Sequence, residues 1–145
     1  MNYSEVWGLT NRGQETENEM EFVGLVTVLL LLQYLVFMLG VGTARTRAGI
    51  EAPAVSGEET FERALRVQVN TMEQLVITLP AMWLSAMYFK PLLAAGLGLV
   101  FFLGRLLYRL GYMKAPAKRA PGMIIGFLAN LGLMGTALWG LVSRI

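Results

Sequence analysis

Long apolar runs, separated by short polar segments, dominate the chain from residue 22 onward. Residues 22–44 form a 23-residue run whose only strongly polar side chain is Gln33. As a helix rising 1.5 Å per residue, this run would be about 34 Å long, enough to cross a hydrocarbon core of about 30 Å. Two further runs cover residues 92–104, continuing through Tyr112, and residues 123–142. The pattern predicts helices that span a membrane.

One more helix is predicted between the first two of these runs. The apolar residues 75–89 are too few to span a membrane alone, but extension back to residue 62 gives a long helix with a polar first half, which Lys90 and Pro91 end. Segments rich in Pro and Gly at residues 46–60 and 114–121 are predicted to be loops. The predicted fold is therefore an all-α integral membrane four-helix bundle over residues 22–145, preceded by an acidic tail at residues 1–21. Gly122 and Gly126 form a GxxxG pair, which predicts close helix packing.

Composition supports a lipid environment and narrows the chemistry. Hydrophobic residues make up 55% of the 145-residue chain and charged residues 15%, against about 25% charged in soluble domains. The chain contains no Cys, no His and no Asp. These absences exclude disulfides, histidine-based catalytic triads and the usual zinc motifs, so no metal site is expected. The basic residues lie beside apolar runs and not on a soluble basic surface, which argues against a nucleic-acid partner.

The charges also predict an orientation. Glu73 is the last acidic residue, and seven basic residues follow it. In a four-span chain the first and third loops share a side, and these two loops are the basic ones. The positive-inside rule then places both loops in the cytoplasm and both termini on the opposite side of the membrane.

Two helices carry polar faces near that cytoplasmic end. Four polar residues of the second helix recur at spacings of 3, 4 and 3 and share one helical face: Arg63, Arg66, Asn70 and Glu73. Three residues of the third helix recur at spacings of 3 and 4: Arg105, Tyr108 and Tyr112. Charged residues inside a span cost about 2.5–3.5 kcal/mol each, so they require a partner or a function.

Two readings of these faces are open. In the first, the acids only neutralise the arginines within the bundle, and the tyrosines are interfacial. In the second, the excess of cations over Glu62 and Glu73 implies an anionic ligand, because unpaired buried cations are costly. A ligand with carboxylates, an amine and amides would use Arg, Glu, Asn and Tyr together.

The residues that form these faces resemble a known family. The stretches FERALRVQVNTMEQLVITLPAMW at residues 61–83 and GRLLYRLGYMKAPAKR at residues 104–119 resemble the MAPEG family, the membrane-associated proteins of eicosanoid and glutathione metabolism. The resemblance covers residue 22 to the end of the chain. It implies a homotrimer of four-helix subunits, with glutathione bound as a cosubstrate at subunit interfaces that open toward the cytosol.

The resemblance also implies roles for individual residues. Eight residues match positions that bind glutathione, some of them across the subunit interface: Arg45, Arg66, Gln68, Asn70, Glu73, Arg105, Tyr108 and Tyr112. Arg119 matches the arginine that stabilises the glutathione thiolate, and Tyr108 is expected to add a hydrogen bond to the sulfur. Gln74 stands where some relatives have a tyrosine, so one ligand contact is expected to be lost or replaced.

The resemblance favours a membrane-bound glutathione transferase that acts on lipophilic electrophiles or lipid hydroperoxides. The non-catalytic branch of the family lacks the thiolate arginine, so Arg119 favours an enzyme. Glutathione peroxidase activity and isomerisation of a prostaglandin endoperoxide would use the same thiolate, and the sequence does not separate them. A protein that binds lipid or glutathione without chemistry is an alternative from another class. A small drug exporter is disfavoured because the first span lacks a carboxylate.

Overall fold

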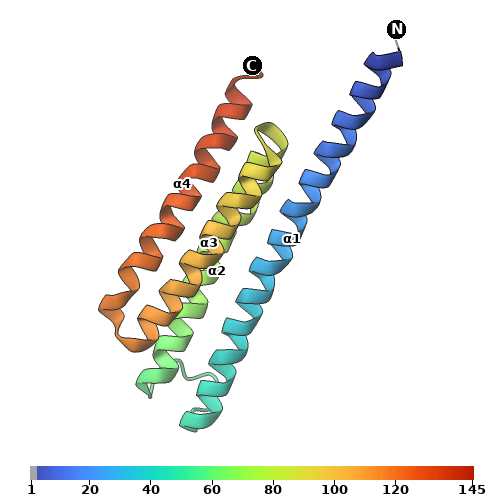
Figure 1. The fold of residues 1–145 in the computed structure, drawn as a ribbon. Coiled ribbons are helices and arrows are strands. Elements are labelled where there is room, and N and C mark those ends of the chain that lie inside the picture. Colours follow the sequence, from blue (N-terminus) through green and yellow to red (C-terminus); the bar gives the residue numbers. More distant parts are fainter. Residues whose placement is uncertain (1–2) are drawn as a thin grey trace.

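A computed structural model describes the backbone of residues 3–145 and the side chains of residue 14 and residues 16–145. It contains four α-helices and one short 3-10 helix: α1 (Tyr3–Ala48), α2 (Glu59–Tyr88), α3 (Pro91–Lys114), η1 (Pro116–Arg119) and α4 (Ala120–Val142). The four α-helices run up and down beside one another (Figure 1). The α1–α2 loop and the α3–α4 connection lie at one end, and the α2–α3 turn and both termini lie at the other.

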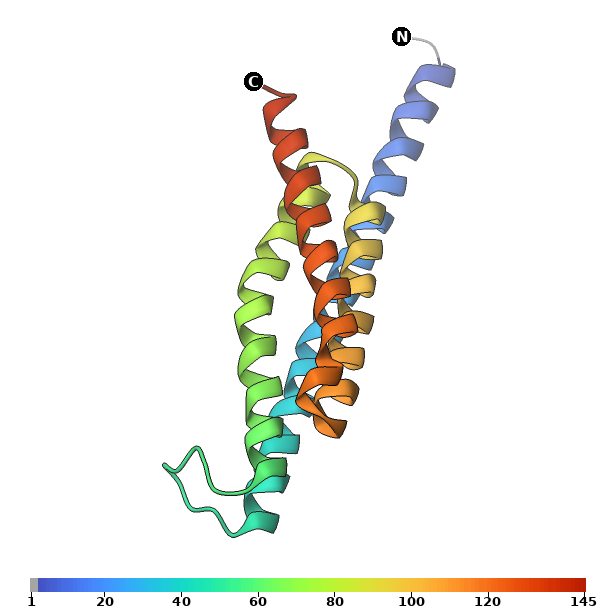
Figure 2. The same ribbon diagram turned by 90° about the vertical axis from the view of Figure 1, so that its left-hand side faces the viewer.

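The first helix is longer than the sequence pattern predicted. The predicted span at residues 22–44 lies inside α1, which has 46 residues and continues through the expected acidic tail. No proline interrupts this stretch, so nothing in the backbone stops the helix before residue 48. In Figures 1 and 2 the first turns of α1 project past the α2–α3 turn. The side chains of Glu5 and Glu15 lie outside the described residues.

Local signals fix the ends of α1 and α2. Gly49 follows α1 with a φ of 64°, a left-handed conformation that favours glycine, and the Ile50 amide donates to the Arg45 carbonyl at 3.2 Å. Glu58 caps the start of α2, because its carboxylate accepts hydrogen bonds from the Thr60 and Phe61 amides, both at 2.9 Å. These hydrogen bonds lower the pKa of Glu58. The cap is therefore complete above the ordinary carboxyl pKa and is lost as the pH falls through the lowered value.

Three of the four helices are long and apolar enough to cross a membrane. Among the described residues these are Thr16–Ala48, Pro91–Lys114 and Pro116–Val142. The second helix is not among them, because its first half carries the polar residues noted above. Large apolar side chains on the other helices face outward, as Leu25, Leu103 and Leu138 do. Lipid chains can cover such a surface favourably, whereas its exposure to water would cost free energy.

Two clusters of buried side chains form the core. The larger includes Leu30, Met82, Phe101 and Leu133, one from each α-helix. The smaller lies toward the end with the α1–α2 loop and joins Phe37, Val67 and Tyr108, with Tyr112 packed against it. The smaller cluster therefore supports two of the predicted site residues.

Buried polar side chains join the helices between these apolar layers. Gln33 of α1 donates to the Phe102 carbonyl of α3 at 3.0 Å. Asn130 of α4 accepts from Thr78 at 2.8 Å and donates to Gln74 at 3.1 Å, and both partners are on α2. Such hydrogen bonds hold helices together where lipid offers no alternative partner.

Glycine lets α3 and α4 approach closely, as the GxxxG pair predicted. A Cβ placed on Gly122 would lie 2.2 Å from the Tyr108 amide nitrogen and 2.6 Å from the Gly104 carbonyl oxygen. Because these are backbone atoms, moving them aside would require a shift of the helix. Gly122 therefore fixes the distance between α4 and the segment of α3 that carries Tyr108.

We predict that Gly122→Ala destabilises the protein, because the added methyl group forces α4 away from α3. The expected loss is about 1–3 kcal/mol, as for other overpacked cores. Gly135→Ala is the matched control on the same helix, since a Cβ there meets nothing within 4 Å. Thermal unfolding of both variants in detergent measures the difference, and equal unfolding temperatures would refute the close-packing role of Gly122.

Candidate functional site

The site is built around Arg105, a buried cation of α3. Only 2% of this residue is exposed, and its Nη2 donates to the Thr71 hydroxyl of α2 at 2.9 Å. Its guanidinium carbon lies 4.0 Å from the centre of the Tyr108 ring. Glu73, two residues after Thr71 on α2, acts on it electrostatically. Its Nε is buried and has no hydrogen-bond partner among the described residues.

Aromatic contacts extend from Arg105 to the 3-10 helix. The Tyr108 and Tyr112 ring centres are 5.6 Å apart, and the Arg119 guanidinium carbon lies 5.5 Å from the centre of the Tyr112 ring. Arg119 is exposed and also donates to the Pro116 carbonyl at 3.4 Å. The structure thus places four predicted residues, from Arg105 to Arg119, in one continuous row of contacts.

The predicted face of α2 lies beside this row. Asn70 donates to the Glu73 carboxylate at 3.1 Å, so the two act as a pair one turn apart. A pocket of about 280 Å³ adjoins them between α2, α3 and α4. Its lining combines polar and apolar residues: Asn70, Gln74, Arg105, Met123, Ile124, Gly126 and Phe127.

A second pocket, of about 410 Å³, lies further toward the same end of the bundle. It includes Arg66 and Tyr112, two more predicted site residues, together with Glu59, Glu62, Arg63 and Pro116. Arg66, Asn70, Glu73 and the row from Arg105 to Arg119 therefore gather on α2, α3 and η1.

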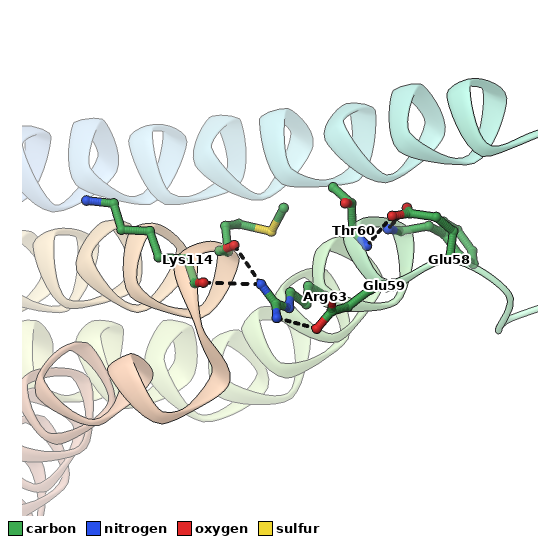
Figure 3. Close-up of polar contacts among 7 residues, drawn as sticks. Glu58, Glu59, Thr60, Arg63 and Lys114 are labelled. Carbon is green, nitrogen blue, oxygen red and sulfur yellow. Dashed lines mark hydrogen bonds and ion pairs between the residues drawn. The ribbon is translucent and has the colours of Figure 1, made fainter.

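Arg63 also lines the second pocket, but its guanidinium is bound by other groups of the protein. Its Nη2 forms an ion pair with Glu59, and its Nη1 donates to the carbonyls of Met113 and Lys114 at 3.1 and 3.3 Å (Figure 3). It therefore joins the start of α2 to the end of α3. This is the one ion pair within 4.0 Å among the described residues. Among the described residues, the excess of cations seen in the sequence is therefore not neutralised by ion pairs.

Two predicted residues lie apart from the group. Arg45 donates to the loop carbonyls of Ala54 at 2.8 Å and Glu51 at 3.4 Å, and its guanidinium covers the Phe61 ring at 4.6 Å. Gln68 donates to the Tyr34 hydroxyl of α1. The structure of the single chain brings neither of them to the group around Arg105.

Sequence reasoning missed two residues that organise the site. Thr71 supplies the hydroxyl that Arg105 binds, yet it lies one position beyond the polar face that was singled out. Asn130 holds the side chain of Gln74 through its amide. Asn130 is an amide inside the apolar run at residues 123–142, a signal that could have marked it. The Gln74 side chain thus binds α4, at the position where the resemblance implied that a tyrosine contact with the ligand is lost or replaced.

The donor set fits an organic anion better than a metal. Three arginines, one phenol, two amides and two carboxylates line the two pockets, and Nε of Arg105 has no partner among the described residues. These groups can hold carboxylates, amides and an amine of one ligand. No group of three or more His, Cys, Asp or Glu side chains able to hold a metal gathers among the described residues.

The fold and site describe a helical membrane protein with a cationic site at one end of the bundle. Comparison with protein families matches residues 23–139 to the MAPEG family, so the chain belongs to that family. The predicted all-α membrane bundle is therefore confirmed as the fold class.

The relatives extend this assignment. The chain is 45% identical over 130 residues to an uncharacterised protein of Synechocystis sp., covering 90% of this chain and 95% of that protein. It is 40% identical over 112 residues to human microsomal glutathione S-transferase 2, covering 76% of each chain. It is 33% identical over 127 residues to bovine leukotriene C4 synthase, covering 88% of this chain and 79% of that protein.

We predict that Thr71→Val destabilises the protein, because it leaves the Arg105 guanidinium buried without the hydroxyl that it binds. Removing one partner of a buried hydrogen bond costs about 1–3 kcal/mol. The matched control is Thr27→Val, since the Thr27 hydroxyl donates only to the Val23 carbonyl of its own helix at 2.8 Å. The unfolding temperature in detergent should fall more for Thr71→Val than for Thr27→Val. An equal decrease in both variants would contradict a special role for the Arg105 contact.

Proposed function

We propose that this chain is a membrane-bound glutathione transferase that conjugates glutathione to lipophilic electrophiles and also reduces lipid hydroperoxides. The observation that carries the proposal is the row from Arg105 through Tyr108 and Tyr112 to Arg119, beside the Asn70–Glu73 pair. The names of two relatives, a glutathione S-transferase and leukotriene C4 synthase, support it.

Each group of the site has a chemical counterpart in glutathione. Arg66 and Arg105 are suited to its carboxylates, Glu73 to its ammonium group and Asn70 to an amide. Tyr112 and Tyr108 offer hydroxyls and ring faces along the same row. This assignment leaves Arg119, at the exposed end, to face the thiol.

One arginine is sufficient to ionise the thiol. A thiol of pKa about 8.5 is about 3% thiolate at pH 7, and a two-unit decrease makes it about 75% thiolate. Such a decrease requires about 2.7 kcal/mol of preference for the charged form. A guanidinium about 4 Å from the sulfur supplies about 4 kcal/mol at an effective dielectric constant of about 20, before desolvation. No histidine base is needed.

The reaction then follows from the thiolate. Its sulfur attacks an electrophilic carbon; with a chloronitrobenzene, a sulfur–carbon bond forms, the carbon–chlorine bond breaks and chloride leaves. The thiol proton passes to solvent. The apolar side of the pocket at α4, with Met123 and Phe127, can hold the lipophilic partner. A substrate dissolved in the bilayer reaches this side without crossing water.

We also propose the assembly and the orientation. The chain spans the membrane four times and forms a homotrimer in which Arg45 and Gln68 serve the site of an adjacent protomer. The two basic connections lie at the same end of the bundle (Figure 1), and this end faces the cytoplasm by the positive-inside rule. The mass of the purified protein–detergent complex tests the trimer, and labelling of single cysteines placed in the two loops tests the orientation.

Replacing Arg119 tests catalysis. We expect Arg119→Ala to lose most of the thiolate absorbance of bound glutathione, and to conjugate chloronitrobenzene about 25-fold more slowly at pH 7, since the thiolate fraction returns from about 75% to about 3%. Lys118→Ala is the matched control, because it removes a neighbouring exposed cation of the same 3-10 helix. Equal thiolate and equal rates in the two variants would remove Arg119 from the mechanism.

Replacing Glu73 or Arg66 tests binding. Glu73→Gln and Arg66→Gln should each raise the dissociation constant of glutathione about tenfold or more, because each removes a hydrogen bond to a charged group worth about 1.5–3 kcal/mol. Glu51→Gln, in the exposed loop, is the control for loss of one carboxylate. Equilibrium dialysis with labelled glutathione measures all three, and unchanged affinity in both site variants would refute the placement of glutathione here.

A further inference from the structure

A separate cavity of about 490 Å³ lies where the end of α1, the start of α2 and the end of α3 meet. None of the proposed glutathione-binding residues lines it. On α1 the lining residues Phe37, Gly40, Ala44 and Arg47 recur at spacings of 3, 4 and 3, so they share one helical face. Arg45 is not among the lining residues. This cavity is therefore not part of the site around Arg105.

Two arginines enter this cavity without an acidic partner. The Arg109 guanidinium covers the Phe37 ring at 4.7 Å, and a Cβ on Gly40 would lie only 3.3 Å from its Nη2. Gly40 thus leaves room for the guanidinium. Neither Arg109 nor Arg47 has a carboxylate oxygen within 4.0 Å among the described residues, where the one ion pair is that of Arg63.

The acid in the cavity lining does not neutralise these arginines. Glu58 also lines the cavity, but its two carboxylate oxygens accept the backbone amides at the start of α2. Its oxygens are therefore occupied by donors other than these two arginines. The cavity keeps two cations available for an anionic ligand.

The cavity is amphipathic along its depth. Phe37 and Val67 belong to the smaller buried cluster and form its apolar floor, while Arg47, Glu58 and Thr60 are exposed at its rim. Outward-facing Leu39 and Leu110 continue the apolar surface on α1 and α3. A ligand that suits this arrangement has an anionic head at the rim and apolar chains that follow the outer surface of the bundle.

We propose that this cavity binds a phosphate ester, supplied by the headgroup of a membrane phospholipid, with Arg47 and Arg109 holding the phosphate. Arginine matches phosphate oxygens with paired donors, and two arginines suit one phosphate group. The three helix ends that line the cavity are then held together by the lipid. Arg47 reaches the headgroup from the surface, and Arg109 reaches it from beside Phe37.

Binding by the purified full-length protein in a neutral detergent tests the proposal. The probes are a short-chain phosphatidic acid, which carries the lipid phosphate, and glycerol 3-phosphate, which carries the same phosphate ester without chains. We expect Arg47→Gln and Arg109→Gln each to weaken phosphatidic acid binding about tenfold, equivalent to about 1.4 kcal/mol. Binding should also weaken as ionic strength rises.

Lys114→Gln is the matched control, because it removes one exposed cation at the same end of the bundle but outside the cavity. It should bind phosphatidic acid as the wild type does. Arg47 is exposed and has no ion pair among the described residues, so Arg47→Gln tests the site even if loss of the Phe37 contact unfolds Arg109→Gln. Both cavity variants, where folded, should bind glutathione as the wild type does.

Three results would overturn the proposal. The first is no binding of phosphatidic acid by the wild type, and the second is equal affinity in Arg47→Gln and Lys114→Gln. The third is glycerol 3-phosphate binding as tight as that of phosphatidic acid, which would assign the cavity to soluble phosphate esters and refute a lipid source. Weak or absent glycerol 3-phosphate binding, with tight lipid binding that depends on Arg47, supports the lipid headgroup.

Discussion

The contact between Arg105 and Thr71 is the interaction on which the organisation of this end of the bundle depends. A guanidinium inside an apolar helix is costly, by about 2.5–3.5 kcal/mol even on the lenient insertion scale. The structure offsets that cost with one hydroxyl from α2, the ring of Tyr108 and the nearby charge of Glu73. Because these groups come from two helices, the position of α2 against α3 and the placement of the cation are determined together.

The same constraint governs the rest of the packing. Lipid provides no hydrogen-bond partners, so polar side chains in the helices must find them in the protein. Gln33 reaches a carbonyl of α3, and Asn130 links Gln74 and Thr78 on α2 to α4. Glycine at position 122 permits the close approach of α3 and α4 that brings the pocket lining together. A bundle held in this way presents fixed cations at one end and apolar surface along its length.

Periodicity and composition predicted much of the fold, because helix positions in a membrane protein follow from long apolar runs. The spans at residues 92–104 and 123–142 lie within α3 and α4, and the loop between α1 and α2 lies where Pro and Gly were concentrated. The extent of α1 was underestimated, since an acidic and polar stretch without proline can continue a helix beyond the membrane. The start of α2 at Glu59 depends on a side-chain cap by Glu58, which the pattern of apolar residues does not predict.

The candidate site was predictable only in part. Spacings of 3 and 4 placed Arg66, Asn70 and Glu73 on one face. The structure puts Asn70, which binds Glu73, in one pocket with Arg105, and Arg66 in another with Tyr112. The role of Thr71 depends on how α2 meets α3, a long-range relation that helical spacing does not contain. The separation of Arg45 and Gln68 from the group likewise reflects the packing of α1. The binding of glutathione by these residues stays a prediction.

The central claim is that the cationic end of this bundle holds glutathione with its thiol ionised. The most direct measurement is a pH titration of the thiolate absorbance of glutathione bound to the purified wild-type protein, with free glutathione titrated in parallel. We expect the apparent pKa of the bound thiol to lie about two units below the ordinary value of about 8.5. A bound thiol that titrates with the same pKa as free glutathione would contradict it.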